Sequence, residues 1–388
     1  MGENKPTDKP QKMPSAEPKR IALAHDFLFA WGGAERTFKV LADAYPDAPI
    51  YTLLADRVFV AEHFPGREIR TSFLQKLPLW IRRRHRFLLP LYAVAVEAID
   101  LRDFDLVISS SGAWMKGLVT RLHTRHIAYL HSPMRYVWDS QERYLREIGR
   151  ERNLLLRIFL SYLRVWDRQS AERPDTLLVN SEFTRRRVEK CYRREATVVY
   201  PPAGILQEQQ SAEAGAETAK EYFLIVARLT RSKRVDRVIE AFNRLELPLM
   251  VIGTGPEEQV LRELAGPTIR FAGAASDRAL ALAYSHARAI IQPSEEDFGL
   301  VVAEALSFGV PTIALASGAA IELVEPGITG ELYMGSTPEM IADGVRRFLE
   351  RESGYQPAVM RHHAARYGST NFLAGIRAAV DQSAAVKR

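Results

Sequence analysis

Short, almost wholly apolar runs alternate with longer amphipathic segments along most of this chain. Runs such as 21–24 and 289–291 contain only apolar residues, which is typical of strands buried on both faces of a parallel sheet. Between the runs, apolar residues recur every three or four positions, the spacing of one helix face. The pattern predicts strands, with the turns that end them, at 21–24, 49–54, 70–74, 104–112, 125–130, 175–181, 196–200, 222–227, 248–256, 269–273, 289–291 and 312–315.

The alternation of strands and helices occurs twice, and Pro201 and Pro202 separate the two halves. This repeat predicts an α/β protein with two Rossmann-like domains that face a central cleft. We place the N-terminal domain at 19–202 and the C-terminal domain at 203–365. Residues 1–18 are rich in Lys, Pro, Glu and Gln and predict a disordered tail. The segment 206–220 predicts an exposed linker or surface helix, and 141–172 predicts a long amphipathic helical region.

Composition narrows the class of protein without indicating a function. With 388 residues, 47% of them hydrophobic and 26% charged, the chain is typical of a globular protein of about two to three domains. Its single cysteine, Cys191, excludes an intrachain disulfide framework and a cysteine-rich zinc site, and it fits a reducing compartment such as the cytoplasm. The net charge of +6 is modest. We expect no transmembrane helix and no signal peptide, because no apolar stretch suits either.

The segment 293–311 predicts a strand end, an acidic turn and a short helix. The backbone amides of Phe298, Gly299 and Leu300 would lie at the helix N-terminus, where free N–H groups and the helix dipole favour an anion such as a phosphate. Glu296 lies just before that helix, and Glu304 lies inside it. The alternative is a purely structural βα unit in which the acidic residues of the turn cap the helix.

Two turns in the N-terminal half also carry candidate binding residues. Gly32 and Gly33 follow the first strand, and a glycine pair there lets the backbone approach a ligand closely. The G-x-G-x-x-G fingerprint is absent, which disfavours an NAD site. His131 follows the strand at 125–130, at the sheet edge where α/β proteins bind ligands. The alternatives are a tight βα turn for the glycines and a structural role for the histidine.

In the C-terminal half, Arg228 and Lys233 follow the first strand of that domain. Two cations at this position suit a diphosphate, because arginine can bind two oxygens at once and lysine supplies a point charge. The alternative is a basic turn on the surface.

The segment 76–92 places basic residues among aromatic and aliphatic ones. Cationic amphipathic segments of this kind lie on anionic membrane surfaces, so the segment predicts contact with a membrane or a lipid-linked acceptor. The alternatives are a basic loop that covers the core and a nucleic-acid contact. The second is disfavoured, because no recognised nucleic-acid-binding module is visible. The residues that carry this prediction are Trp80, Arg82, Arg83, Arg84 and Arg86.

Several strings in the chain resemble one family. They are EDFGLVVAEAL from Glu296, GGAE from Gly32, YLHSPMRYVWD from Tyr129 and ARLTRSKRVD from Ala227. Together they resemble the retaining glycosyltransferases of the GT-B fold, family 4 (group 1), over nearly the whole chain after residue 18. The third string resembles bacterial GDP-mannose-dependent mannosyltransferases. One departure is Ala227, which stands where a glycine is common in the family.

The resemblance implies a role for each candidate residue. Arg228, Lys233 and the helix start at 298–300 would neutralise the leaving diphosphate. Glu296 would contact the donor sugar or its developing oxocarbenium charge, and Glu304 would accept hydrogen bonds from the ribose hydroxyls. The remaining roles that it implies are a cleft-lining loop at Gly32 and Gly33, a nucleobase contact near Gly273, a sugar-facing His131, and a C-terminal helix at about 366–388 that crosses back onto the N-terminal domain.

The resemblance also implies the substrates and their location. We expect a nucleotide-sugar donor, GDP-mannose, with no cofactor and no metal in the active site. The acceptor would be a saccharide or a polyprenyl-diphosphate-linked sugar in lipopolysaccharide, surface polysaccharide or glycolipid assembly. The protein would be cytoplasmic and peripheral at the inner face of the cell membrane, with no nucleic-acid partner. The alternatives are a UDP-sugar-dependent enzyme of the same fold and a non-catalytic sugar-nucleotide-binding or scaffold protein.

Overall fold

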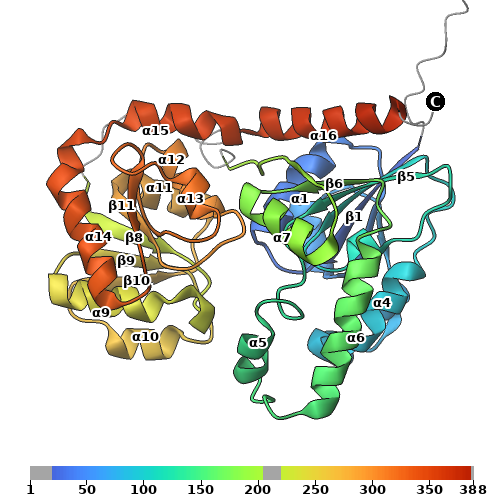
Figure 1. Ribbon diagram of the computed structural model, residues 1–388, viewed down its shortest axis with the longest axis horizontal. Coiled ribbons are helices and arrows are strands. Elements are labelled where there is room, and N and C mark those ends of the chain that lie inside the picture. Colours follow the sequence, from blue (N-terminus) through green and yellow to red (C-terminus); the bar gives the residue numbers. More distant parts are fainter. Residues whose placement is uncertain (1–19, 204–219, 386–388) are drawn as a thin grey trace, which may run out of the picture.

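The computed structural model describes residues 20–203 and 220–385. The chain forms two α/β domains that lie side by side, each built on one parallel sheet (Figure 1). This arrangement confirms the predicted fold class of two Rossmann-like domains. The predicted tail at 1–18 and nearly all of the predicted linker at 206–220 lie outside the described residues.

The N-terminal sheet has seven strands in the order β3-β2-β1-β4-β5-β6-β7, and each neighbouring pair is parallel. Both of its faces are covered, since Leu23 packs into one apolar core and its neighbours Ala22 and Ala24 pack into another. The strands are β1 (Ile21–Leu28), β2 (Ile50–Ala55), β3 (Ile69–Thr71), β4 (Leu106–Ser111), β5 (Arg125–Leu130), β6 (Thr176–Val179) and β7 (Thr197–Val198).

The C-terminal sheet has six strands in the order β10-β9-β8-β11-β12-β13, again all parallel. This order makes β8 and β11 direct neighbours at the centre, so the turns that follow them lie at one edge of the sheet. The strands are β8 (Tyr222–Val226), β9 (Leu249–Ile252), β10 (Ile269–Gly273), β11 (Ala287–Gln292), β12 (Thr312–Leu315) and β13 (Gly330–Tyr333).

Helices connect the strands of both sheets. Those of the N-terminal domain are α1 (Gly33–Ala44), α2 (Arg57–His63), α3 (Leu79–Arg82), α4 (Leu89–Glu97), α5 (Gln141–Glu147), α6 (Leu154–Ser170) and α7 (Glu182–Tyr192). After β8 come α9 (Val235–Leu245), α10 (Glu258–Leu264), α11 (Asp277–His286), α12 (Leu300–Ser307), α13 (Ala320–Leu323), α14 (Pro338–Arg351), α15 (Pro357–Ala364) and α16 (Ser369–Ala385).

The last helix, α16, returns to the N-terminal domain and lies across it (Figure 1). Phe372 and Ile376 are buried in the same apolar core as β1 and α1. The Phe372 ring meets Tyr129 of β5 edge-on at 5.4 Å between centroids. Arg125 Nη1 donates a hydrogen bond to the Val380 carbonyl oxygen at 3.2 Å. These contacts make α16 part of the packing of the N-terminal domain.

The structure departs from the predicted elements in three places. The predicted strand at 70–74 ends at Thr71, because Ser72 caps a 3-10 turn at Phe73–Lys76. The helical region at 141–172 is two helices, α5 and α6, separated at Gly149, whose φ of +64° is a left-handed conformation that ends a helix. Strand β13 was missed, because Gly327 and Gly330 indicate a turn; a β-carbon at Gly330 would overlap the Thr312 carbonyl of β12.

Candidate active site

A cavity of about 290 Å³ lies between the two domains at the carboxyl ends of central strands of both sheets. The N-terminal domain lines it with residues that follow β1, β5 and β6, and the C-terminal domain with residues that follow β8 and β11. This is the edge at which open α/β sheets bind ligands. Seven of the predicted site residues line it: Gly33, His131, Lys233, Glu296, Phe298, Gly299 and Leu300.

Lys233 and Glu296 form an ion pair inside this cavity. The distance from Lys233 Nζ to Glu296 Oε1 is 2.6 Å. The same carboxylate oxygen accepts hydrogen bonds from Ser294 Oγ at 2.6 Å and from Gln292 Nε2 at 3.3 Å. Residues at the end of β11 therefore anchor the carboxylate. Lys233 reaches it from the 3-10 turn Arg231–Lys233, which follows the neighbouring strand β8. An anion that binds in the cavity would compete with Glu296 for the lysine.

The turn before α12 closes one side of the cavity. Gly299 has a φ of +87° and is the N-cap residue of α12, a conformation that favours glycine. Phe298 is buried and packs against the rings of Tyr200 and Tyr367. Across the cavity, a β-carbon at Gly33 would overlap Leu300 Cδ1. Gly33 therefore lets the N-terminus of α1 approach that of α12.

Glu304 lies on α12 but does not line the cavity. Its Oε2 accepts a hydrogen bond from the Tyr284 hydroxyl at 2.8 Å, and its Oε1 lies 3.5 Å from Arg36 Nη1 of the N-terminal domain. Burial raises the pKa of the Glu304 carboxyl to about 7, against the opposing effects of Arg36 and Tyr284. The ribose contact implied by the resemblance stays a prediction.

Arg228, Gly32 and Gly273 do not line the cavity. Arg228 is exposed after β8, and its guanidinium has no hydrogen-bond or ion-pair partner within the described part of the chain. Gly32 is the N-cap residue of α1. Gly273 ends the edge strand β10, and its carbonyl oxygen accepts a hydrogen bond from the Gly253 N–H at 2.8 Å. The loop after β8 packs so closely on the loop after β9 that a β-carbon at Gly253 would overlap the Ala227 carbonyl.

Behind His131 lies a chain of polar groups that sequence reasoning missed. His131 Nε2 lies 2.8 Å from Ser110 Oγ of β4, and Ser110 Oγ lies 3.1 Å from His25 Nδ1 of β1. His25 Nε2 in turn lies 3.5 Å from Glu35 Oε1 of α1. Burial lowers the pKa of His131 to about 3, so its ring is neutral at neutral pH. His25 lies beside Ser110 because β1 pairs with β4, and the sequence pattern does not predict which strands pair.

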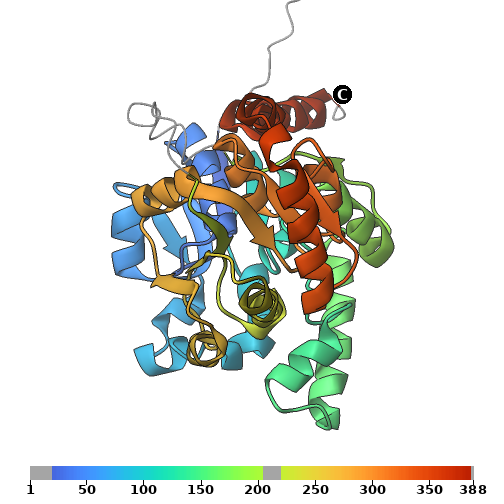
Figure 2. The same cartoon turned by 90° about the vertical axis from the view of Figure 1, so that its left-hand side faces the viewer.

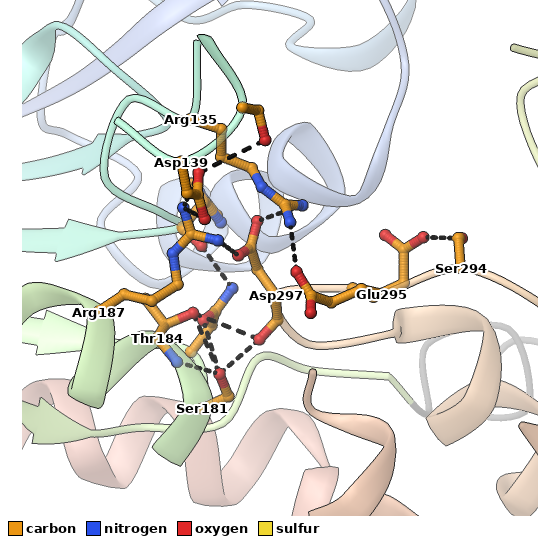
Figure 3. A network of polar contacts seen from close by, with 12 residues as sticks. Arg135, Asp139, Ser181, Thr184, Arg187, Ser294, Glu295 and Asp297 are labelled. Carbon is orange, nitrogen blue, oxygen red and sulfur yellow. Dashed lines mark hydrogen bonds and ion pairs between the residues drawn. The ribbon is translucent and has the colours of Figure 1, made fainter. Parts of the chain in front are cut away.

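The acidic turn also joins the two domains through a polar network (Figure 3). Asp297 Oδ1 lies 3.4 Å from Arg187 Nη1, and Asp297 Oδ2 lies 3.5 Å from Arg135 Nη1. Arg135 Nη2 also contacts Glu295 Oε1 at 2.9 Å. Burial raises the pKa of the Asp297 carboxyl, although both arginines oppose this shift. The residues on either side of Glu296 are therefore held by the N-terminal domain.

The start of α7 completes this contact between the domains. The Ser181 and Thr184 hydroxyls both donate to the Asp297 carbonyl oxygen. Glu322 of α13 accepts hydrogen bonds from the backbone N–H groups of Glu182 and Phe183, at 3.0 and 3.3 Å. A carboxylate there satisfies amides that a helix N-terminus leaves without partners. Sequence reasoning missed both the Asp297 carbonyl and the Glu322 carboxylate that reach this helix start.

The basic and aromatic segment forms η2 (His85–Leu88), α3 and α4, at the lower end of the N-terminal domain (Figures 1 and 2). Trp80 and Phe87 expose 65% and 79% of their surface, more than a role in covering the core requires. Arg83 and Arg84 are exposed as well. Arg82 is partly buried and donates from Nε to the Leu77 carbonyl oxygen at 3.0 Å, and the side chain of Arg86 lies outside the described atoms.

Helix α6 extends to the same end of the molecule (Figures 1 and 2). It also exposes a row of apolar side chains. One face of α6 packs into the core through Leu160, Leu163 and Trp166. A different face exposes large apolar side chains three and four positions apart, which places them in one row. They are Leu155, Ile158, Tyr162 and Val165. No helix in residues 20–203 or 220–385 is long and apolar enough to cross a membrane.

Comparison with known proteins defines the class. Residues 31–203 match the family model described as Glycosyltransferase Family 4, and residues 207–369 match the one described as Glycosyl transferases group 1. The two matches together span most of the chain, and its architecture is that of the GT-B fold. The N-terminal half of the chain therefore matches one glycosyltransferase family and the C-terminal half another, and the two halves form the GT-B fold.

The curated relatives agree on the class and differ in substrate. A GDP-mannose-dependent alpha-mannosyltransferase of Corynebacterium glutamicum is 34% identical over 115 residues, which is 29% of this chain and 28% of that protein. A D-inositol 3-phosphate glycosyltransferase of Corynebacterium urealyticum is 28% identical over 307 residues, or 69% of each chain. The first match thus covers well under half of the relative's length.

Solved structures show the same fold at low identity. Anabaena Alr3699/HepE in complex with UDP superposes with a TM-score of 0.66 and 16% identity, over 94% of this chain and 100% of that chain. The lipopolysaccharide outer core galactosyltransferase WaaB gives a TM-score of 0.61 at 17% identity, over 92% of this chain and 99% of the other. These likenesses establish the fold and leave the choice of sugar open.

Proposed function

We propose that this protein is a retaining glycosyltransferase that moves α-mannose from GDP-mannose to a saccharide or polyprenyl-diphosphate-linked acceptor. The observation that carries the proposal is the inter-domain cavity, where Lys233, Glu296 and the start of α12 meet His131. A cation and a helix N-terminus suit the diphosphate, and the carboxylate and the imidazole suit sugar hydroxyls. The partial match to a GDP-mannose-dependent enzyme supports the choice of donor.

The reaction in this proposal breaks the bond between the sugar C1 and the diphosphate oxygen. Negative charge then grows on the leaving diphosphate, where Lys233, Arg228 and the amides at the start of α12 would stabilise it. The acceptor hydroxyl forms the new bond to C1 on the same face, and its proton passes to the leaving phosphate. Glu296, once released by Lys233, would bind the sugar hydroxyls or the developing oxocarbenium ion.

The proposed transfer needs no metal ion, because side chains and backbone amides of the protein supply the positive charge. Transfer measured with EDTA would proceed at the rate seen without it. A rate that EDTA abolishes and Mg²⁺ or Mn²⁺ restores would contradict this part of the proposal.

A second candidate is a UDP-sugar-dependent transferase. The observation that favours it is the likeness to a structure solved in complex with UDP-glucose. A donor that binds only the folded protein raises its melting temperature, so thermal shift with GDP-mannose, UDP-glucose and UDP-N-acetylglucosamine distinguishes the two. Release of GDP or UDP from the stabilising donor then tests catalysis. A protein that is stabilised by a donor but releases no nucleotide, alone or with acceptor lipids, would be a binding protein.

In this proposal the N-terminal domain, which would bind the acceptor, contacts the anionic inner face of the cell membrane. Exposed Trp80 and Phe87 stand beside exposed arginines on one segment, and the apolar stripe of α6 lies at the same end of the molecule. Aromatic and aliphatic side chains enter the headgroup boundary, while arginines interact with anionic lipids. Further exposed arginines lie on α5, on α6 and in the loop between them, namely Arg143, Arg146, Arg150, Arg152 and Arg168.

A further inference from the structure

The polar chain behind His131 contacts one of its two ring nitrogens, Nε2. It links Glu35, His25, Ser110 and His131 by consecutive contacts of 3.5, 3.1 and 2.8 Å, from α1 across β1 and β4 to the end of β5. His25 and Ser110 are buried, so no surface water replaces these partners. The chain ends at the cavity, which His131 lines.

The number of protons on each group decides which atom donates in each hydrogen bond of this polar chain. Burial raises the pKa of the Glu35 carboxyl, but the hydrogen bond with His25 opposes this shift, and the pKa lies below its ordinary value, so Glu35 is a carboxylate. A carboxylate only accepts hydrogen bonds, so the facing Nε2 of His25 carries a proton. A single proton on the His25 ring, which is itself part of the proposal below, leaves Nδ1 of His25 as an acceptor for the Ser110 hydroxyl.

The same count continues to the cavity. The single hydroxyl proton of Ser110 points at His25, so Ser110 Oγ accepts from Nε2–H of His131. The remaining nitrogen of His131, Nδ1, has no partner among the described residues. A separate hydrogen bond, from Asn180 Nδ2 to the His131 carbonyl oxygen at 2.9 Å, holds the backbone in place.

We propose that Glu35, His25 and Ser110 are positioning residues that hold His131 with its proton on Nε2, so that Nδ1 faces the cavity as a hydrogen-bond acceptor. Such a nitrogen accepts from a hydroxyl and repels a phosphate oxygen, which also only accepts. His131 therefore accepts a hydrogen bond from a hydroxyl of the donor sugar and takes no part in neutralising the diphosphate. The identity of that hydroxyl rests on the proposed function, whereas the tautomer does not.

The test is the nitrogen NMR spectrum of the full chain labelled with ¹⁵N-histidine, recorded at pH 8, above the ordinary pKa of histidine. Two-bond proton–nitrogen correlations distinguish a protonated ring nitrogen from a bare one. The nine histidines of the chain are distinguished by comparison with a His131→Gln spectrum. We expect a protonated Nε2 and a bare Nδ1 at His131. A protonated Nδ1, alone or together with Nε2, overturns the proposal.

Variants separate positioning from general damage. Ser110→Ala and Glu35→Ala should turn the single His131 tautomer into a mixture, while Ser110→Thr, which keeps the hydroxyl, should preserve it. Asp43→Asn, which alters an exposed carboxylate on the same helix as Glu35, is the matched control and should leave the His131 signals unchanged. A single unchanged tautomer in both Ser110→Ala and Glu35→Ala would show that the chain does not set it.

Kinetics connect the tautomer to the proposed reaction. Loss of one hydrogen bond to the sugar predicts that Ser110→Ala lowers kcat/KM for the donor by up to about tenfold, with recovery in Ser110→Thr. If no nucleotide sugar is turned over and the expected tautomer is observed, the proposed function fails and the tautomer assignment stands. If turnover is normal and Nδ1 carries the proton, the tautomer assignment fails alone.

Discussion

Lys233 Nζ lies 2.6 Å from Glu296 Oε1, although the two residues are 63 positions apart in the chain. They meet because β8 and β11 are neighbours in the sheet and each residue follows the carboxyl end of its strand. Ser294 and Gln292 hold the carboxylate from its own side, so the lysine is the partner that can leave. A bound diphosphate would exchange this contact for its own and release Glu296 towards the sugar.

Lys233→Ala tests this exchange. The variant should lose about 2–4 kcal/mol of transition-state stabilisation in kcat/KM for the donor, the size expected for a charged contact to the leaving group. Its melting temperature should change little, because the Glu296 carboxylate keeps two hydrogen bonds. Steady-state kinetics and thermal unfolding measure the two effects. The control is Arg231→Ala, an exposed cation in the same 3-10 turn, and equal kinetics in both variants and the wild type would remove Lys233 from the site.

The pair also shows what the sequence could predict. Buried parallel strands are visible as apolar runs, so every predicted strand overlaps an observed one. The turns after β5, β8 and β11 carry His131, Lys233 and Glu296, which line the cavity. Strand order decides which of those turns meet, and the local pattern carries no record of it. The contacts of Asp297 with Arg135 and Arg187 were out of reach for a further reason, because they depend on how the two domains are set against each other.

Asp297 is the centre of the contact between the domains, and its removal should loosen that contact. Asp297→Ala leaves Arg187, which is 10% exposed, without one carboxylate partner, and breaking such a partly buried pair costs about 3 kcal/mol. We expect a lower free energy of unfolding of the two-domain protein by urea. We also expect a larger radius of gyration by X-ray scattering, because fewer contacts oppose opening of the domains.

A double-mutant cycle of Asp297→Ala with Arg187→Met measures the coupling between the two residues directly. The control is Arg185→Met, which breaks an exposed pair with Glu182 on the same helix and should cost less than about 1 kcal/mol. Additive effects of the first two substitutions, with an unchanged radius of gyration, would contradict the proposed role of Asp297.

Glu304 should make stability depend on pH. Burial raises its folded-state pKa to about 7 from an ordinary value of 4.5, so between these values the folded protein binds a proton that the unfolded chain does not. Its contribution to stability is therefore largest below about pH 4.5, decreases as pH rises towards 7 by at most about 3 kcal/mol, and is constant above that.

Urea unfolding of the wild type and of Glu304→Gln from pH 5 to pH 8 checks this dependence. Glutamine keeps an acceptor for the Tyr284 hydroxyl and does not titrate. The free energy of unfolding of the wild type should therefore fall relative to that of Glu304→Gln as pH rises to 7. Glu350→Gln, an exposed carboxylate on α14, serves as the control. A difference that stays constant over this range would show that Glu304 titrates with its ordinary pKa.

The arginines at the C-terminal end of α3, of which Arg83 and Arg84 are exposed, should contribute to membrane binding. Replacing Arg82, Arg83 and Arg84 with serine removes up to three charges near the bilayer, each worth about 1 kcal/mol at an anionic surface. We expect weaker sedimentation with vesicles that contain phosphatidylglycerol and no change with neutral phosphatidylcholine vesicles. Binding of the soluble donor, measured by thermal shift, should persist, because none of these residues lines the cavity.

The apolar stripe of α6 contributes by a different mechanism and needs its own variant. Leu155→Ser with Ile158→Ser removes two exposed aliphatic side chains from one row, which should weaken binding to anionic vesicles and leave its salt dependence intact. The arginine variant should instead lose salt dependence. The control has the same change of charge on the C-terminal domain, where serine replaces the exposed Arg231, Arg270 and Arg346. If this control weakens vesicle binding as much as the arginine variant does, net charge alone explains the effect of the arginines. Vesicle binding that is unchanged in Leu155→Ser with Ile158→Ser would exclude the α6 stripe as a membrane contact.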